Sequence, residues 1–505
     1  MNAKTFGRLV PLVSGILAVA AAGCIRVSTD AQASRPIVVP KAYNARDLGE
    51  WATPLPALGV RPGFFSESEF ERIPAATLYR SYPAYHPDRE PPGYWEWLQK
   101  QPPKPLLDVS ELRTQSDWIA AGKIVFRELY RAGPGSTADL VPLARSRDAL
   151  ARAGVETMPD GTLPLLWVVT PDGVEPKMKT CQSCHTRYLD DGTALDGAPA
   201  NHGGAGVQRL IALRDAAPER STAQRRAQAY QGCRSGAPWL KDDHCSAINS
   251  MTSEELSQLE VENRYGLAIL PRGGDQIFPV KTLDLNGVRD RKYLNHTATH
   301  LNRDVGDIMR YALNVECCSS GMFGSYRLRP NPPRFRYPDD VLFALASYIY
   351  SLQPPPSPYR NNPLAVDGRK VFERAGCGHC HTPPLYTNNK LTPAQGFVPP
   401  ADHPYHDDIM PDSVGTDPGR ATQTSVATGF YRVPSLRGVW YRGLFGHSGD
   451  VASLEEWFDP ARLRDDFVPS GFKGVKPTRA VRGHEYGLTL PAAEKRALIA
   501  FLKTL

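Results

Sequence analysis

Several patterns that mark particular classes of protein are missing from this sequence. It has no block of basic residues and no basic stretch interleaved with aromatic residues, which argues against a nucleic-acid partner. Beyond residue 23, no apolar run is long enough to cross a bilayer. Cysteine and histidine are scarce, with 9 and 12 occurrences in 505 residues, so a repeated pattern made of both is hard to attribute to chance.

Proline, by contrast, is abundant, with 47 occurrences, which is roughly twice the usual share. The content of 41% hydrophobic and 22% charged residues is typical of a globular protein, and the length allows two or three domains. Because proline interrupts both helices and strands, much of the chain is expected to be ordered loop.

The first residues have the composition of a secretory signal. Basic residues precede an apolar run, Leu9 to Ala22, that is short for a membrane span, so residues 1–23 are predicted to be a signal peptide. Two outcomes stay open: acylation of Cys24 as the first residue of a lipoprotein, or plain cleavage near Ala22 or Ala33. In both cases we expect the mature protein in the periplasm or outside the cell, with membrane contact only through such a lipid anchor.

Two pentapeptides, Cys181-Gln182-Ser183-Cys184-His185 and Cys377-Gly378-His379-Cys380-His381, share the pattern Cys-x-x-Cys-His. This is the spacing for covalent haem c attachment, in which two thiols add to vinyl groups and the imidazole ligates iron. A zinc half-site or a redox disulfide would leave the histidine unexplained twice. The sequence therefore predicts two covalently bound haems c. The attachment residues are Cys181, Cys184, Cys377 and Cys380, and the proximal iron ligands are His185 and His381.

The remaining cysteines beyond residue 24 form two pairs. In an oxidising compartment, Cys233 and Cys245 most simply form a local disulfide that closes a short polar loop. The adjacent Cys317 and Cys318 could form a strained vicinal disulfide or stay as buried thiols, and the sequence does not decide between these.

The chain contains one unit twice. The stretch Gly122-Lys123-Ile124-Val125-Phe126 corresponds to Gly368-Arg369-Lys370-Val371-Phe372, and each copy precedes a pentapeptide. An apolar helix follows each pentapeptide, beginning near Asp339 in the first copy and lying at the C-terminus in the second. A looser third correspondence relates Gly287-Val288 and His296 to Gly438-Val439 and His447.

This order of elements is the one expected of a cytochrome c domain, so we predict a mainly α fold with two cytochrome c-like haem domains and extensive loops. A Pro-rich segment, residues 24–108, is expected to extend over the surface, with short helices such as Glu67 to Ile73. The domains are residues 109–353 and 364–505, joined by a linker at 354–363. The first is larger because of insertions, which are either surface elaboration or walls of a substrate pocket.

For the second haem, the best candidate for the other axial ligand is His484, which lies just before the closing helix. His447 is the runner-up, and it could instead hydrogen-bond a haem propionate. No methionine follows Met410, so a later methionine ligand is excluded.

For the first haem, the repeat places nothing equivalent to His484 before the closing helix. Met322 is the nearest candidate ligand. His296 and His300 are alternatives, either as ligands, as acid-base groups beside an open iron, or as propionate partners. Glu316 is a further candidate for moving a proton. The asymmetry between the units favours an open or weakly occupied first haem.

Around the second pentapeptide the sequence resembles a known family. The stretches Gly376 to Thr387, Val433 to Val439 and Gly446-His447-Ser448-Gly449 are similar to the bacterial di-haem cytochrome c peroxidase superfamily. The large first domain and Gly483-His484-Glu485-Tyr486-Gly487 resemble its branch of MauG-like proteins and RoxA-like rubber oxygenases. The resemblance covers about residues 110–505 and leaves out the Pro-rich segment.

The resemblance implies a division of labour between the haems. An N-terminal haem at His185 would react with peroxide or dioxygen, and a haem held by His381 and His484 would relay electrons. The chain departs from the family in three respects: it lacks the methionine ligand of the peroxidases, and it lacks the tyrosine ligand of MauG unless Tyr486 serves. It also has Thr297-Ala298-Thr299 near His296 in place of Trp-Asp-Gly, which puts polymer cleavage in doubt.

The sequence thus predicts an exported haem-dependent oxidoreductase, peroxidase-like or oxygenase-like, that acts on peroxide, dioxygen or an organic substrate. Its electron donor is expected to be a small redox protein or a quinol-linked donor, and a bridging Ca2+ ion is left open. The alternative is a di-haem electron-transfer cytochrome with both irons six-coordinate, since an iron closed on both faces passes electrons but binds no oxidant.

Overall fold

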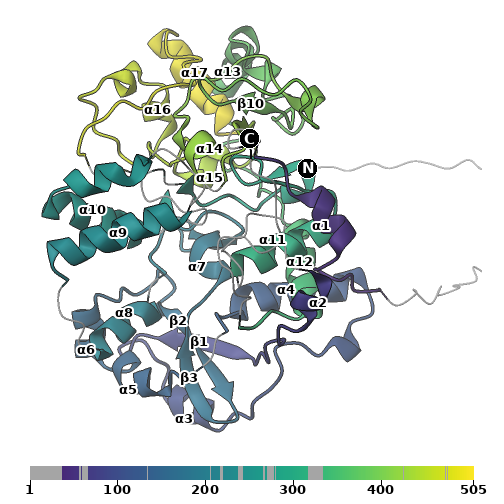
Figure 1. Cartoon of the computed structure of the whole chain (residues 1–505), viewed down its shortest axis with the longest axis vertical. Coiled ribbons are helices and arrows are strands. Elements are labelled where there is room, and N and C mark those ends of the chain that lie inside the picture. Colours follow the sequence, from purple (N-terminus) through teal and green to yellow (C-terminus); the bar gives the residue numbers. More distant parts are fainter. Residues whose placement is uncertain are drawn as a thin grey trace, which may run out of the picture. The chain divides into compact units, whose positions relative to one another are not determined.

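The structure, a computed structural model, describes most of the chain from residue 37 onward (Figure 1). The described residues are 37–55, 59, 66–132, 135–204, 206–215, 220–236, 243–264, 268–269, 278, 280–316, 334–424, 426–472, 474 and 476–505. The predicted signal peptide, Cys24, Cys317, Cys318 and Met322 lie outside these ranges. Within them, no helix combines the length and the apolar character needed to cross a membrane.

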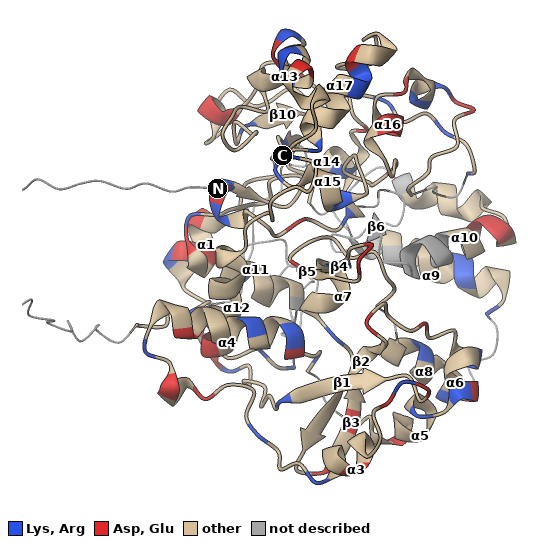
Figure 2. Cartoon of the chain, turned by 180° about the vertical axis from the view of Figure 1, so that it is seen from behind, with Lys and Arg blue, Asp and Glu red and all other residues tan. Residues whose placement is uncertain are grey.

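Helices make up the larger share of the described secondary structure, which confirms the prediction of a mainly α fold. In the first half they are α1 (Ala45–Trp51), α2 (Glu67–Glu71), α3 (Tyr94–Gln99), α4 (Gln115–Glu128), α5 (Val141–Ala144), α6 (Arg147–Ala153), α7 (Cys181–His185), α8 (Gly206–Arg214), α9 (Thr222–Gly236) and α10 (Ser253–Arg264). The later helices are α11 (Val305–Glu316), α12 (Asp339–Ser351), α13 (Leu364–Arg374), α14 (Gly419–Gln423), α15 (Val439–Arg442), α16 (Leu454–Trp457) and α17 (Ala492–Leu502). Basic and acidic residues are interspersed along these elements (Figure 2).

The strands are fewer and mostly short. They are β1 (Ser81–Tyr85), β2 (Thr162–Thr170), β3 (Gly173–Lys177), β4 (Thr186–Tyr188), β5 (Ala194–Asp196), β6 (Ala268–Ile269), β7 (Val280–Lys281), β8 (Tyr293–Leu294), β9 (His300–Leu301), β10 (Leu391–Pro393) and β11 (Phe430–Arg432). The largest described sheet has the order β1-β2-β3, and both of its pairings are antiparallel.

The Pro-rich segment was predicted to extend over the surface, but in the structure part of it belongs to the sheet and to the core. It supplies β1 to the three-stranded sheet, and it buries Trp51 completely, with the indole N–H donating to the Leu301 carbonyl at 3.1 Å. The short helix expected around Glu67 is α2, which begins with a capping box between Ser66 and Glu69. Long-range strand pairing of this kind leaves no local pattern in the sequence.

The repeated unit is visible in how the opening and closing helices pack. In the first copy α4 packs on α12, and in the second α13 packs on α17. A methyl group built on Gly122 would lie 1.9 Å from the Ala344 carbonyl oxygen, and one on Gly368 would lie 1.9 Å from that of Ala497. Each glycine therefore permits the closest approach of its helix pair. This confirms the predicted repeat of an opening and a closing helix.

Aromatic residues one turn further along repeat the same geometry. Phe126 meets Tyr348 with ring centres 5.5 Å apart, and Phe372 meets Phe501 at 5.3 Å, both edge to face. Edge-to-face packing is a preferred arrangement of aromatic pairs. The same two layers of contacts thus hold both helix pairs together.

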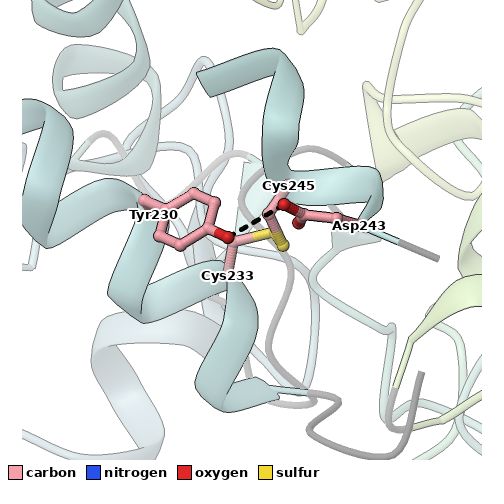
Figure 3. The surroundings of a disulfide bond; sticks show 4 residues. All are labelled: Tyr230, Cys233, Asp243 and Cys245. Atoms are coloured by element: carbon pink, nitrogen blue, oxygen red, sulfur yellow. Dashed lines mark hydrogen bonds between the residues drawn. A yellow bond between two sulfur atoms is a disulfide. The ribbon is translucent and has the colours of Figure 1, made fainter. Parts of the chain in front are cut away.

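The predicted disulfide between Cys233 and Cys245 is present and joins α9 to the short helical turn at His244–Ser250 (Figure 3). Both cysteines are fully buried, in a small cluster with Ile248 and Leu256. Tyr230 donates to the Asp243 carboxylate at 2.9 Å beside the bond. The disulfide therefore stabilises the part of the first unit that has no counterpart in the second.

Candidate haem sites

The second pentapeptide lies where α13 ends and borders a cavity of about 670 Å³, a volume in the usual range of ligand sites. Cys377 and Cys380 both line the cavity and are not joined by a disulfide, and burial raises the pKa of each thiol. Gly376, with a φ of +73°, allows the sharp turn from the helix into the motif. Both thiols are thus presented to the cavity from one short turn.

His381 is oriented by backbone carbonyls. Its Nδ1 lies 3.1 Å from the Pro434 carbonyl oxygen and 3.3 Å from that of Tyr386. Because carbonyls only accept hydrogen bonds, Nδ1 must carry the proton, which leaves Nε2 as the nitrogen that can bind a metal. Burial lowers the pKa of His381, so the imidazole is held in the neutral form that ligates iron.

His484 faces His381 across the same cavity. The centres of the two imidazole rings are 6.2 Å apart, and the ring planes are inclined by 52°. An imidazole nitrogen binds a metal at about 2 Å, and the ring centre lies about 1 Å further, so two imidazoles on opposite faces of one metal place their centres about 6 Å apart. The structure therefore brings together the two histidines that the sequence paired, at the separation needed to hold one iron.

The backbone around His484 is held in an unusual conformation. His484 has a φ of +49° and follows Gly483 at +82°. A left-handed conformation outside glycine costs about 1 kcal/mol or more and persists only where neighbours impose it. The His484 amide donates to the Val414 carbonyl at 2.6 Å, and a methyl group on Gly483 would collide with the Thr416 amide nitrogen. The strain thus coincides with the position that the imidazole needs.

Arg462, which the sequence analysis missed, holds this loop from behind. It is fully buried and donates to the carbonyls of Gly483 and His484, each at 2.9 Å, and to that of Val481. Its Nε donates to the Trp457 carbonyl, and the Trp457 ring lies 5.4 Å from the His484 ring. Burial, the facing His381 and Arg462, in that order, lower the pKa of His484 to about 4, so this imidazole is also neutral at neutral pH.

A group of basic residues, here termed the cation cluster, lines the same cavity. Its members are Arg187, Lys281, Arg291, Arg432 and Arg442, and the one acidic residue among the described lining residues is Asp284. Burial, with a smaller contribution from neighbouring cations, lowers the pKa of Lys281 to about 7, of Arg432 to about 9 and of Arg291 to about 10. Cations gathered in this number in one partly buried cavity require anions close by.

The residues around the second pentapeptide therefore fit a haem c. Two thiols, two facing imidazoles and a cavity are present, and the cation cluster matches the carboxylates of haem propionates. Among the described residues, no group of three or more His, Cys, Asp or Glu side chains could hold a metal ion without a porphyrin, so the Ca2+ ion stays a prediction.

The runner-up ligand His447 lines the cavity too, but it is engaged elsewhere. Its ring stacks on Tyr431 with centres 4.6 Å apart, and its Nδ1 lies 3.5 Å from the Thr416 hydroxyl. His296, predicted to lie near the first haem, lines this same cavity, with its Nε2 3.2 Å from the Lys281 carbonyl oxygen. Burial lowers the pKa of both histidines.

The first pentapeptide forms α7, which packs against α4. The His185 carbonyl accepts from the Gly197 amide at 2.7 Å, and the Cys184 carbonyl accepts from the Ala200 amide at 3.0 Å. Cys181 is buried. The motif thus lies between the opening helix and the inserted segment that follows it.

The structure gives the described candidates for the first haem other neighbours. The His300 ring packs on Trp51 with centres 4.0 Å apart, and its Nδ1 hydrogen-bonds the Thr299 hydroxyl at 2.9 Å. Glu316 is the last residue of α11, and its side chain lies outside the described part. Met322 also lies outside the described residues. The sixth position of the first haem therefore stays a prediction.

Comparison with known proteins gives little further guidance. No family model and no curated protein matches the chain. Among solved structures, the hydrazine synthase of Kuenenia stuttgartiensis aligns over 57% of this chain and 93% of its own, with 16% identity and a TM-score of 0.29. A MauG-like protein associated with microbial copper homeostasis covers 57% and 90%, with 16% identity and a TM-score of 0.30. The diheme peroxidase BthA from Burkholderia thailandensis covers 45% and 66%, with 22% identity and a TM-score of 0.23. At TM-scores this low, these likenesses carry no argument about fold or function.

Proposed function

We propose that the protein is an exported di-haem c-type oxidoreductase in which the haem at His185 reacts with peroxide or dioxygen and the haem at His381 relays electrons. The observation that carries this proposal is the pair of imidazoles, His381 and His484, facing each other at 6.2 Å in a cavity that Cys377 and Cys380 line. An iron held by both would have no position left for an oxidant. The reactive role therefore falls to the other haem.

Haem c, when bound, supplies an iron that exchanges one electron and, where one face is open, binds a small oxidant. The chain's own residues set the conditions for this. The carbonyl of Pro434 keeps the proton of His381 on Nδ1 and so directs Nε2 toward the metal. The strained loop holds the His484 ring facing that of His381, so the two imidazoles together would hold the iron. Together these residues would keep small oxidants away from the second haem.

For proton transfer at the first haem the proposal keeps the sequence candidates His296, His300 and Glu316, of which His296 lines the cavity beside the second pentapeptide. Of these, His296 has a defined tautomer: its Nε2 donates to the Lys281 carbonyl, which leaves Nδ1 as the nitrogen that can accept a proton. Burial lowers its pKa, so the ring is neutral and Nδ1 is unprotonated, although a weaker base than a free imidazole. A small redox protein or a quinol-linked donor would supply the electrons in the periplasm or outside the cell, where Cys24 could anchor the protein.

The test is the response of the purified ferric protein to cyanide and to hydrogen peroxide. We expect two haems per chain, one low-spin and silent, and one that binds a single cyanide and shifts its Soret band with peroxide. Electron paramagnetic resonance should show one high-spin and one low-spin ferric signal. Two low-spin haems that ignore both ligands would instead establish the electron-transfer cytochrome.

A further inference from the structure

Two segments from different halves of the chain have the same internal structure. Lys281, Gly287, Arg291 and His296 in the first correspond in order, and at equal spacing, to Arg432, Gly438, Arg442 and His447 in the second. Each glycine has a left-handed backbone and begins a short helix, with φ values of +71° and +76°.

The two arginines of these segments fold their own loops in the same way. Arg291 donates to the carbonyls of Asp284 and Asn286, and Arg442 donates to those of Ser435 and Arg437. The accepting residues are again equivalent in the two segments. The looser correspondence noted in the sequence is therefore a true structural repeat.

The segments also exchange backbone hydrogen bonds with each other. The Lys281 amide donates to the His447 carbonyl at 3.0 Å, and the Arg432 amide donates to the His296 carbonyl at 3.0 Å. Equivalent atoms are thus paired reciprocally, as about a local two-fold axis. All four residues line the cavity, as do Arg291 and Arg442, so each half of the chain contributes two cations and one histidine to it at equivalent positions.

Among the residues that the structure describes, most of the cation cluster has no carboxylate partner. Asp284 lies 2.9 Å from Arg442, and among the described residues no carboxylate lies within ion-pair distance of Lys281, Arg291, Arg432 or Arg187. Arg187 follows the first pentapeptide by two residues, and the second pentapeptide lines the cavity directly. The cluster therefore shares its cavity with the second motif and includes a residue that closely follows the first motif in sequence.

We propose that the cation cluster binds the propionate carboxylates of both haems. Lys281, from the first half of the chain, and Arg432, from the second, are its equivalent members. This inference rests on the proposed function, since it needs two haems. Four cations without a carboxylate partner match the four propionates that two haems carry, and the reciprocal arrangement distributes them between the halves. Both haems, when bound, would then respond to the same charges.

The experiment measures both midpoint potentials of the intact protein by spectroelectrochemical titration, for wild type and for Arg432→Gln, Arg432→Lys and Lys281→Gln. Loss of a cation near both haems favours the ferric state of each. We expect both glutamine variants to lower the ferrous-to-ferric ratio of both haems about tenfold at a fixed potential, which is about 59 mV for a one-electron couple. Arg432→Lys keeps the charge and should leave both potentials near the wild-type values.

Haem content, measured on the same samples, separates this inference from the proposed function. A wild-type chain without two haems overturns both. Two haems whose potentials do not move, or a shift confined to one haem, overturn the shared cluster alone, and Lys281→Gln gives the answer if Arg432→Gln fails to fold. Added acetate should leave the wild-type potentials unchanged, because the propionates already fill the cluster. A dependence on acetate would show that the cluster binds free carboxylates instead.

Discussion

In both halves of the chain a glycine of the opening helix touches an alanine carbonyl of the closing helix, and a phenylalanine one turn later meets an aromatic ring. The two halves differ in what surrounds the pentapeptide. Cys377 follows Gly368 by 9 positions, whereas Cys181 follows Gly122 by 59, and strands β2 and β3 lie in that insertion. The helix crossing is thus a scaffold common to both units, while the ligand environment is set by loops that are not repeated.

The comparison is tested most severely by removing the attachment cysteines from one unit at a time. We expect the double variant Cys377→Ala, Cys380→Ala to lose the second haem from the chain entirely, because no thioether can form. The double variant Cys181→Ala, Cys184→Ala should lose the first. Intact-protein mass and haem content per chain measure this, and a first-unit variant that keeps two haems would show that the first pentapeptide holds none.

The difference in ligation is tested by His484→Ala. Loss of this imidazole opens one face of the second iron, so the number of cyanide molecules bound per chain should rise from one to two. The low-spin ferric signal in electron paramagnetic resonance should become high-spin. His447→Ala is the matched control, because His447 lines the same cavity but stacks on Tyr431. The second haem of this variant should keep its low-spin signal. An unchanged signal in His484→Ala would remove His484 from the site.

These residues also show what the sequence could and could not predict. The glycine and phenylalanine of each opening helix recur at a fixed spacing, and His484 stands just before the closing helix, so local pattern was enough for both. Strand β1 pairs with a segment about eighty residues away, and pairing of this kind has no local signature.

The cation cluster escaped the sequence analysis for a different reason. Its members are distributed over both halves of the chain, and each looks like an ordinary basic residue until folding brings them together. Gly287 and His296 correspond at equal spacing to Gly438 and His447, and the same spacing links Lys281 to Arg432 and Arg291 to Arg442. Extending that comparison by a few residues was the signal that could have found the cluster.

The shared scaffold predicts that Gly122→Ala and Gly368→Ala have similar effects. In each variant the new methyl group would lie 1.9 Å from a helical carbonyl oxygen that cannot move aside alone, so the helices must separate. We expect a loss of about 3 kcal/mol in the free energy of unfolding for each variant, from overpacking of a buried contact. Urea titration followed by circular dichroism measures this loss.

Gly49→Ala is the control for those two variants. Gly49 lies in α1, is exposed and has nothing within 4 Å of the added methyl, so alanine should be neutral or slightly stabilising there. A strong effect at one of the two buried glycines and none at the other would mean that the two helix pairs are not equivalent.

The smallest expected effect concerns the residue that makes the second unit different. Arg462 bonds three carbonyls of the loop that carries His484, including that of His484 itself. Lysine keeps the charge but loses the planar fork that reaches several carbonyls at once. The strained loop of Arg462→Lys should therefore release His484 in a fraction of molecules, seen as a partial high-spin signal that added imidazole converts back to low-spin.

Arg420→Lys exchanges an equally buried arginine that donates to the Phe278 carbonyl, so it should lower stability to a similar degree without a high-spin signal. If both variants keep a fully low-spin second haem, the backbone of the loop holds His484 by itself, and the difference between the units lies in that loop and not in its support.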